Sequence, residues 1–311
     1  MRYSVLCGIL RRPLCGFLAL LGCLAAAPSM SAGDVSLTVS AGARVEDNLV
    51  VEELDRSDSE SDVAGVAQAD LGYQLDITDA DRLKAGYRFE QRSFAERSEF
   101  DLQLHYGSVD YSHELGGLRL GANLDATLAK LDQERLLDNR QASIYASGLA
   151  RPKLFVRAAL SFQETDFASA SERASESGRF SSAAYYFLDG ADEYFNLSYR
   201  FEREDAQAGE FDFDAHRISI GYTKRFHLSE RQSLRLRADW RFENRDYDNV
   251  TPSIGERRDE DRQRWRLRLD APITKILSVE LKYEHRNYSS NLDALDFTDN
   301  RIQALLSVQL L

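Results

Sequence analysis

Cysteine is almost absent from this chain of 311 residues: there are three, and all lie among the first 23 positions. The remainder therefore has neither disulfides nor thiolate chemistry. Basic residues are also in deficit, with 39 Lys and Arg against 51 Asp and Glu, which excludes a general nucleic-acid binder. A mean hydropathy of −0.44 excludes a polytopic helical membrane protein, and 10% aromatic residues argue against disorder. These averages are typical of a soluble acidic protein, but the order of the residues indicates otherwise.

The first 33 residues differ from everything that follows. Three arginines precede the apolar run PLCGFLALLGCLAAAP, and the small residues SMSAG follow it. This order predicts a cleaved secretory signal peptide at residues 1–33, with cleavage between Ala27 and Asp34. A transmembrane anchor is the alternative, but the run is short and is bracketed by prolines. The sequence LLGC also resembles a lipobox, in which Cys23 would be lipidated.

From Asp34 to the end, apolar and polar residues alternate. Every second residue is apolar in VSLTVSAGARV (35–45), and LRLRADWRF (234–242) repeats the pattern. A period of two predicts β-strands with one apolar and one polar face. A change of phase near Gly107 and Ser108 predicts a β-bulge. The strand segments are expected at 34–47, 61–77, 82–92, 98–114, 118–131, 139–150, 154–166, 178–188, 193–204, 211–227, 233–247, 259–271, 276–288 and 299–311.

The connections between these segments alternate in length. Six are short turns, and seven are longer and polar, among them 48–60, 167–177, 248–258 and 289–298. An even number of strands with this alternation places both termini of the chain on the side of the short turns. The sequence therefore predicts an all-β protein, a single antiparallel transmembrane β-barrel of about 14 strands over residues 34–311 in the bacterial outer membrane, with short periplasmic turns and longer extracellular loops.

A soluble β-sandwich or barrel is the alternative fold. Its strands would usually have about five or six residues, whereas a tilted membrane-spanning strand needs about nine to eleven. The predicted strands are long, and each has one apolar face and one face rich in Arg, Glu, Asp and Gln. Apolar faces toward lipid and charged faces toward a wet lumen explain this pattern best.

Aromatic residues fall near both ends of the predicted strands, where a membrane barrel carries two girdles. At the loop ends these are Phe89, Phe94, Phe100, Phe201, Phe211, Phe242, Tyr247 and Tyr288, and at the turn ends Tyr73, Tyr111, Phe187 and Phe226.

This pattern resembles the bacterial outer-membrane β-barrel superfamily along residues 34–311. The opening VSLTVSAGARVEDNLVVEE (35–53) resembles the first strand and turn of the barrel part of surface lipoprotein assembly modifiers, and of barrels associated with exopolysaccharide export. The resemblance implies insertion by the barrel assembly machinery. It also implies outer-membrane lipid and lipopolysaccharide as surroundings, with a solute, an exported polysaccharide or a lipoprotein as the client.

Signs of catalytic or metal chemistry are few. The five histidines lack metal-ligand spacing, no phosphate-binding glycine loop occurs, and we expect neither a cofactor nor an enzyme. The alternative is an outer-leaflet hydrolase in which His285 acts with Ser289, Ser290 and Asn291. The carboxylate pairs Glu52/Glu53 and Asp259/Glu260 are interpreted as solvated surface.

The polar faces of three successive late strands carry most of the remaining information. Cross-strand ion pairs that stiffen the wall would explain these charges, and so would a lining that selects charged or sugar solutes. The predicted lumen-lining residues are Arg235, Arg237, Arg241, Arg264, Arg266, Arg268, Lys282, Arg286, Asp239, Glu243, Asp270, Glu280 and Glu284.

Two functions follow as hypotheses. The first is a channel or transport conduit, because fourteen strands lie nearer the barrels that hold an aqueous channel than the filled ones of about eight, and no loop is long enough to form a separate plug. The second is an assembly or surface-interaction barrel that handles lipoproteins or exopolysaccharide without free diffusion.

Charge is distributed unevenly along the chain. Without the first 33 residues, 36 basic residues oppose 51 acidic ones, a net charge of −15. The acidic excess is expected in a loop rim next to lipopolysaccharide, where divalent cations could bridge the two, above an arginine-rich interior. The rim residues are Glu52, Glu53, Asp55, Asp58, Glu60, Asp293, Asp296 and Asp299.

Overall fold

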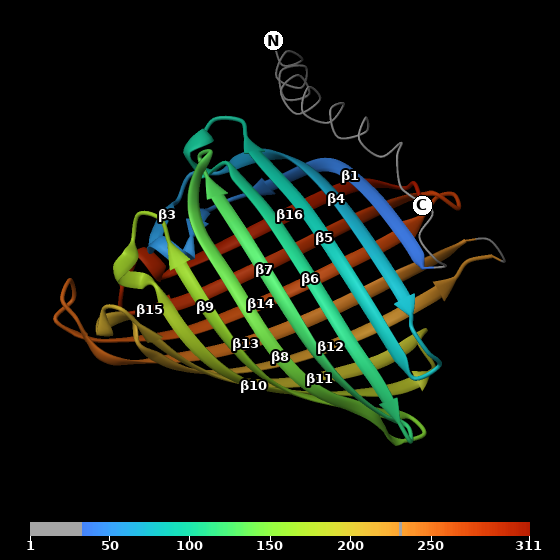
Figure 1. Cartoon of the computed structure of the whole chain (residues 1–311). Helices are drawn as coiled ribbons and strands as arrows, with labels where there is room; N and C mark the ends of the chain where they lie inside the picture. The colour runs from blue at the N-terminus through green and yellow to red at the C-terminus, as the bar shows by residue number, and fades with distance from the viewer. Residues whose placement is uncertain (1–32, 230–231) are drawn as a thin grey trace, which may run out of the picture.

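The fold is a closed antiparallel β-barrel of fourteen strands (Figure 1). The computed structural model describes residues 33–229 and 232–311, so residues 1–32 of the predicted signal peptide, with Cys23, lie outside the described part. Each barrel strand pairs with its neighbour in the chain, and β1 pairs with β16 to close the wall. The strands are β1 (Asp34–Glu46), β4 (Asp62–Asp76), β5 (Asp81–Phe94), β6 (Leu102–Leu115), β7 (Leu118–Leu131), β8 (Glu134–Arg151), β9 (Leu154–Phe167), β10 (Ser175–Asp189), β11 (Glu193–Ala206), β12 (Phe213–His227), β13 (Ser233–Thr251), β14 (Glu256–Pro272), β15 (Leu277–Ser290) and β16 (Phe297–Gln309).

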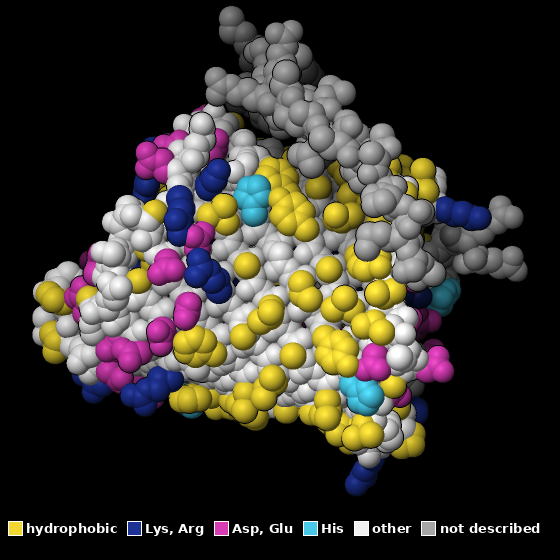
Figure 2. Space-filling model, in the orientation of Figure 1, with side chains coloured by type: hydrophobic (Ala, Val, Ile, Leu, Met, Phe, Trp, Pro, Cys, Tyr) yellow, Lys and Arg dark blue, Asp and Glu magenta, His cyan; other side chains and the backbone are white. Residues whose placement is uncertain are grey.

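Burial is reversed relative to a soluble protein. The exposed large side chains are apolar, for example Leu124, Ile144 and Leu160 at 57–62% exposure, whereas the buried side chains include many arginines and carboxylates. Hydrophobic side chains cover the middle of the wall, and charged ones gather at its loop end (Figure 2). An outward apolar band around a polar interior is the arrangement that lipid stabilises, which confirms the predicted transmembrane barrel.

The two ends of the barrel differ as predicted. Tight turns such as Gly116–Gly117 close one end, where β1 begins and β16 ends (Figure 1). The prediction of a longer connection between residues 131 and 139 is wrong. Asp132 and Gln133 alone join β7 to β8, and their φ angles of 48° and 66° are those of a two-residue hairpin turn. The loop predicted at 248–258 is shorter as well, because β13 and β14 extend to leave only 252–255.

Short 3₁₀ helices occupy most of the longer connections. They are η2 (Glu52–Leu54), η3 (Ser98–Phe100), η4 (Ser171–Arg173), η5 (Gly209–Phe211) and η6 (Asp293–Leu295). Over the described ranges 33–229 and 232–311, no helix has the length and hydrophobicity needed to cross a bilayer.

The connection between β1 and β4 folds as a small hairpin of its own. Its strands are β2 (Leu49–Val51) and β3 (Arg56–Asp58), with η2 at the tip. Leu49, 1% exposed, and Val51 pack against Phe100 of η3 and Leu136 of β8. The expectation that no loop forms a plug is therefore wrong: this hairpin has an apolar core inside the loop end of the barrel.

The same core explains the change of phase near Gly107 and Ser108. No register shift occurs in β6 there, so the predicted β-bulge is wrong. Leu102 and Leu104 belong to the inward face, and Leu104 packs on the cluster that holds the hairpin. An apolar inward position beside the hairpin, rather than an irregular backbone, produces the apparent shift in the sequence pattern.

The outward face of β9 offers a test of the membrane-facing surface. Leu160 lies near the middle of the strand, and we expect Leu160→Arg to lower the free energy of unfolding by about 2–4 kcal/mol in lipid. Urea unfolding in phospholipid vesicles measures this. The matched control is Ala159→Arg, whose side chain faces the lumen and should cost much less. Equal effects at both positions would contradict the assigned orientation.

Candidate functional site

The predicted lumen-lining residues all lie on β13, β14 and β15 and share one face of these strands. Glu243 and Glu284 are buried among them. The strand register groups them into rows of directly opposed side chains. Arg241, Arg264 and Arg286 form an upper arginine row nearer the loops. Arg237, Arg268 and Lys282 form a lower basic row, and Asp239, Arg266 and Glu284 lie between the two.

Ion pairs link many of these residues across the strands. Arg266 Nη2 lies 2.8 Å from Glu284 Oε2, Arg237 Nη2 3.3 Å from Asp270 Oδ2, and Arg268 Nε 3.3 Å from Glu280 Oε2. Glu243 accepts hydrogen bonds from Arg217 on β12 and from Arg245 on its own strand. The wall is therefore cross-braced, as one of the two interpretations predicts, but the bracing is incomplete in the upper row.

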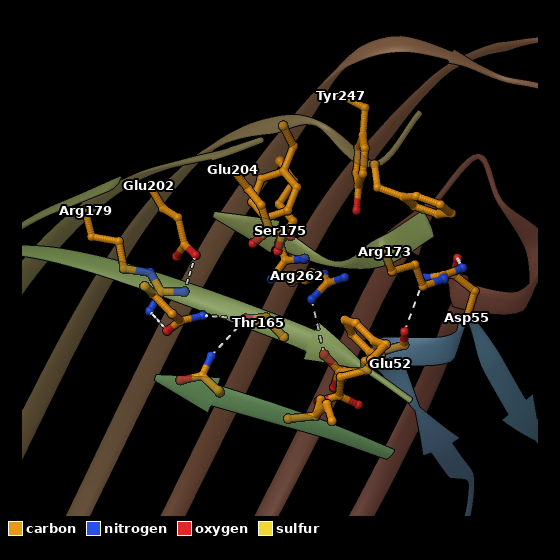
Figure 3. A pocket seen from close by; sticks show the side chains of 18 of the residues that line it. Glu52, Asp55, Thr165, Arg173, Ser175, Arg179, Glu202, Glu204, Tyr247 and Arg262 are labelled. Atoms are coloured by element: carbon orange, nitrogen blue, oxygen red, sulfur yellow. Dashed lines mark hydrogen bonds and ion pairs between the residues drawn. The ribbon is translucent and has the colours of Figure 1, made fainter. Parts of the chain in front are cut away.

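The hairpin tip enters this charged wall. Glu52 accepts hydrogen bonds through both carboxylate oxygens, from Arg286 Nη1 at 2.7 Å and from Arg262 Nη1 at 3.1 Å. Arg262 and Glu52 point toward each other across the cavity in Figure 3. Glu52 is therefore a bridge between the loop and two different strands rather than part of an acidic rim.

Asp55 makes a second bridge from the other side of the tip. Its carboxylate faces Arg258 in a two-bond arrangement, with Nη1 and Nη2 at 3.2 and 3.1 Å, and it also pairs with Arg173 of η4. Asp55 has φ of 50° and ψ of 40°, a left-handed conformation that Asp tolerates better than most residues. The predicted acidic rim is thus wrong for Asp55 as well, since its charge is turned inward.

Two further carboxylates that the sequence analysis placed at the surface or in a loop are buried. Glu260 is 1% exposed between Arg258 and Arg262, the latter at 2.6 Å, and Asp299 is 0% exposed beside Arg286. The interpretations of Glu260 as solvated surface and of Asp299 as a loop residue are therefore wrong. Each adds a second carboxylate beside buried guanidinium groups that also pair with Glu52 or Asp55 of the hairpin tip.

Several aromatic residues also have a different place from the predicted girdles. Tyr247 is buried inside the barrel, and the guanidinium carbon of Arg258 lies 4.4 Å from its ring centre. Arg173 lies 4.2 Å from the ring of Phe211 in the same way. Such cation–π contacts hold the guanidinium groups in fixed positions. Phe94, Phe100, Phe187 and Tyr288 share the inward orientation, whereas Phe89, Phe201, Phe242, Tyr73, Tyr111 and Phe226 face outward.

A cavity of about 390 Å³ lies beneath the hairpin tip, with seven arginines and five carboxylates among its lining residues. On β8 and β9 its lining is uncharged, with Asn139, Gln163 and Thr165 beside the apolar Leu137 and Phe167. Glu53 projects into this space. Because protein surrounds its carboxyl group and the negative Glu52 adjoins it, the pKa of Glu53 is raised above its usual value. The cavity therefore offers both signs of charge to a polar solute.

The residues of the hydrolase hypothesis are not brought together. His285 is on the outward face, with Nδ1 2.8 Å from Asn300 Oδ1. No contact in the described chain joins it to Ser289, Ser290 or Asn291. Among residues 33–229 and 232–311, no three His, Asp or Glu side chains are grouped in a way that could hold a metal ion.

Sequence reasoning missed the inward position of the hairpin tip and its partners Arg258 and Arg262, with which the buried Glu260 also pairs. One signal lies in the loop itself: Leu49-Val50-Val51 is a run of three apolar, β-forming residues within the predicted polar loop 48–60. A run of this kind in a loop indicates a segment that is buried against something.

Comparisons with known proteins rest on structure. No protein-family model matches the sequence, and no curated protein matches it. The in-vitro folded OmpT, an outer membrane protein of Vibrio cholerae, in its trimer form, superposes with a TM-score of 0.53 and 11% identity, covering 90% of this chain and 100% of that one. An anion-selective porin from Comamonas acidovorans gives 0.50 and 10%, with 90% and 100% covered. At these identities the similarity concerns the fold alone, which is that of an outer-membrane β-barrel.

Proposed function

We propose that this protein is a channel of the bacterial outer membrane for small polar or charged solutes, which pass along the arginine-rich wall formed by β13, β14 and β15. The observation that carries the proposal is the cavity of about 390 Å³ beneath the hairpin tip, which Arg245 of β13 and Arg258 and Arg262 of β14 line on one side and uncharged residues of β8 and β9 line on another. Charged side chains held around such a space favour solutes that they can hydrogen-bond. The predicted signal peptide would supply the export that an outer-membrane location requires.

The selectivity of the pore tests this role. We expect the triple variant Arg237→Gln, Arg268→Gln, Lys282→Gln to shift the reversal potential toward cations, because it removes three positive charges from the lower basic row. Planar bilayers under a KCl gradient measure the shift. The matched control, Asp270→Asn with Glu280→Gln, removes the acidic partners and should shift the potential the other way. Unchanged selectivity in both variants would exclude this wall as the pathway.

The hairpin favours a second candidate function. It fills part of the loop end of the barrel and is held by apolar packing as well as ion pairs, as expected of a barrel that does not allow free diffusion. In that case the protein would act in surface display of lipoproteins or exopolysaccharide, as the resemblance of its opening sequence implies. Purified protein without conductance, together with a deletion strain defective in surface display, would favour this alternative.

A further inference from the structure

We propose that Arg241 and Arg264 form a binding site for an oxyanion, the carboxylate or phosphate group of a solute, inside the lumen below the hairpin tip. The inference deepens the proposed channel function and rests on it for the role of the site, but binding itself does not require conduction.

The two arginines are forced together by the strand register. Arg241 on β13 stands directly opposite Arg264 on β14, and Arg264 stands opposite Arg286 on β15. Directly opposed side chains on one face of an antiparallel pair have Cβ atoms about 4.5–5.5 Å apart, and like charges in that position destabilise the sheet. Three arginines in one row therefore need negative charge from elsewhere.

The protein supplies that charge to only one of the three. Arg286 is paired with Glu52 and Asp299. Neither Arg241 nor Arg264 has a carboxylate within ion-pair distance in the described chain, and Nε of Arg241 is buried without a hydrogen-bond partner. A buried donor that lacks a partner carries a large desolvation cost, which a bound acceptor removes.

The nearby carboxylates are already engaged. Glu243 is shared between Arg217 and Arg245, and Glu52 is shared between Arg262 and Arg286. Rotation of Glu243 toward Arg241 would take the carboxylate away from Arg217 and Arg245, and rotation of Glu52 would break the ion pairs that hold the hairpin tip to Arg262 and Arg286.

A space for the ligand is present at this position. A cavity of about 130 Å³ is lined by Arg241 and Arg264 together with three further arginines, two glutamates and Tyr288, a formal charge of +3. It shares Glu52, Arg217, Arg245 and Arg262 with the larger cavity, so the two cavities adjoin. The volume suits one small anionic group with a few water molecules.

The chemistry of the donors selects the ligand class. Guanidinium groups present planar pairs of N–H donors that match carboxylate and phosphate oxygens two at a time, whereas a halide ion has a single centre. Apart from Tyr288, the residues that line this cavity are charged, so an aromatic or apolar group would find little surface to pack against. We therefore assign the site to an oxyanion group rather than to an aromatic or neutral sugar group.

Titration with inorganic phosphate, and separately with acetate, tests the site in detergent-solubilised full-length protein at constant ionic strength. We expect saturable phosphate binding that Arg241→Gln with Arg264→Gln weakens by about tenfold or more, since charge-assisted hydrogen bonds are among the strongest available. The matched control is Arg82→Gln with Arg119→Gln, which removes two arginines near the turn end of the barrel that have carboxylate partners. Binding in this control should be unchanged.

Folding provides a second readout that does not depend on detecting weak binding. In buffer without oxyanions, Arg241→Gln with Arg264→Gln should unfold at an equal or higher urea concentration than the wild type, because a like-charge contact is removed. Phosphate should raise the unfolding midpoint of the wild type only. Equal phosphate binding in the wild type and the Arg241/Arg264 variant would overturn the site, as would equal stabilisation. Binding by a protein that conducts no ions would support the site and contradict the channel.

Discussion

Replacing residues 49–58 by a short Gly-Ser linker is expected to raise single-channel conductance several-fold. The deletion removes the hairpin β2–β3 and its tip, which occupy the loop end of a fourteen-stranded barrel that is otherwise wide enough for water. The barrel wall should remain intact, because the strands pair with each other and with no part of the hairpin. Planar bilayer recordings of the refolded variant measure the change.

Two milder variants separate the contributions to hairpin docking. Glu52→Gln with Asp55→Asn removes the ion pairs and leaves the apolar core, so we expect a small rise in conductance and more frequent switching between levels. Leu49→Ala with Val51→Ala does the reverse: it keeps the ion pairs and weakens the apolar packing of the hairpin. If the full deletion conducts no better than the wild type, the hairpin does not limit the pore. If neither conducts at all, the alternative without free diffusion gains support.

Glu260→Gln is expected to destabilise the protein by about 3–5 kcal/mol. This carboxylate is 1% exposed and accepts hydrogen bonds from Arg258 and Arg262, so its neutralisation leaves buried positive charge without its nearest counter-charge. The midpoint of urea unfolding in lipid vesicles, followed by tryptophan fluorescence, measures the loss.

A matched control for this loss is Glu114→Gln. Glu114 also pairs with an arginine, Arg119 at 3.1 Å, but both side chains are about half exposed at the turn end of the barrel. Exposed ion pairs contribute little to stability, so the midpoint should hardly move. Similar losses in both variants would show that burial of the network does not set its strength.

The barrel was predictable because the alternation of apolar and polar residues along each strand indicates which face contacts lipid. The pattern in 234–242 specifies β13 almost residue by residue, since a shift by one position would place every arginine in the membrane. Strand ends were less predictable. Residues 134–138 contain two adjacent leucines, Leu136 and Leu137, which both pack on the cluster that holds the hairpin, so the period of two is interrupted where β8 begins.

The site was predictable only where it lies on regular strands. Arg241 and Arg264 could be assigned to one face from their spacing, but their direct opposition depends on a register that alternation alone does not determine. Glu52 could not be assigned to the interior, because a loop residue has no period that indicates its direction. Leu102 and Leu104 did signal the hairpin, through an inward apolar surface that had no partner until the hairpin was placed there.

The docked hairpin also has a consequence for the order of assembly. Glu52 is 210 and 234 residues away from its partners Arg262 and Arg286, although β1, which leads into the hairpin, is the first strand of the barrel. Contacts so distant in sequence form late, after the intervening chain has found its place. The tip can therefore reach its final position only once β14 and β15 are in the wall. The hairpin is therefore fully docked only in the completed barrel. In a barrel that lacks β14 and β15, the acidic tip remains apart from their arginines.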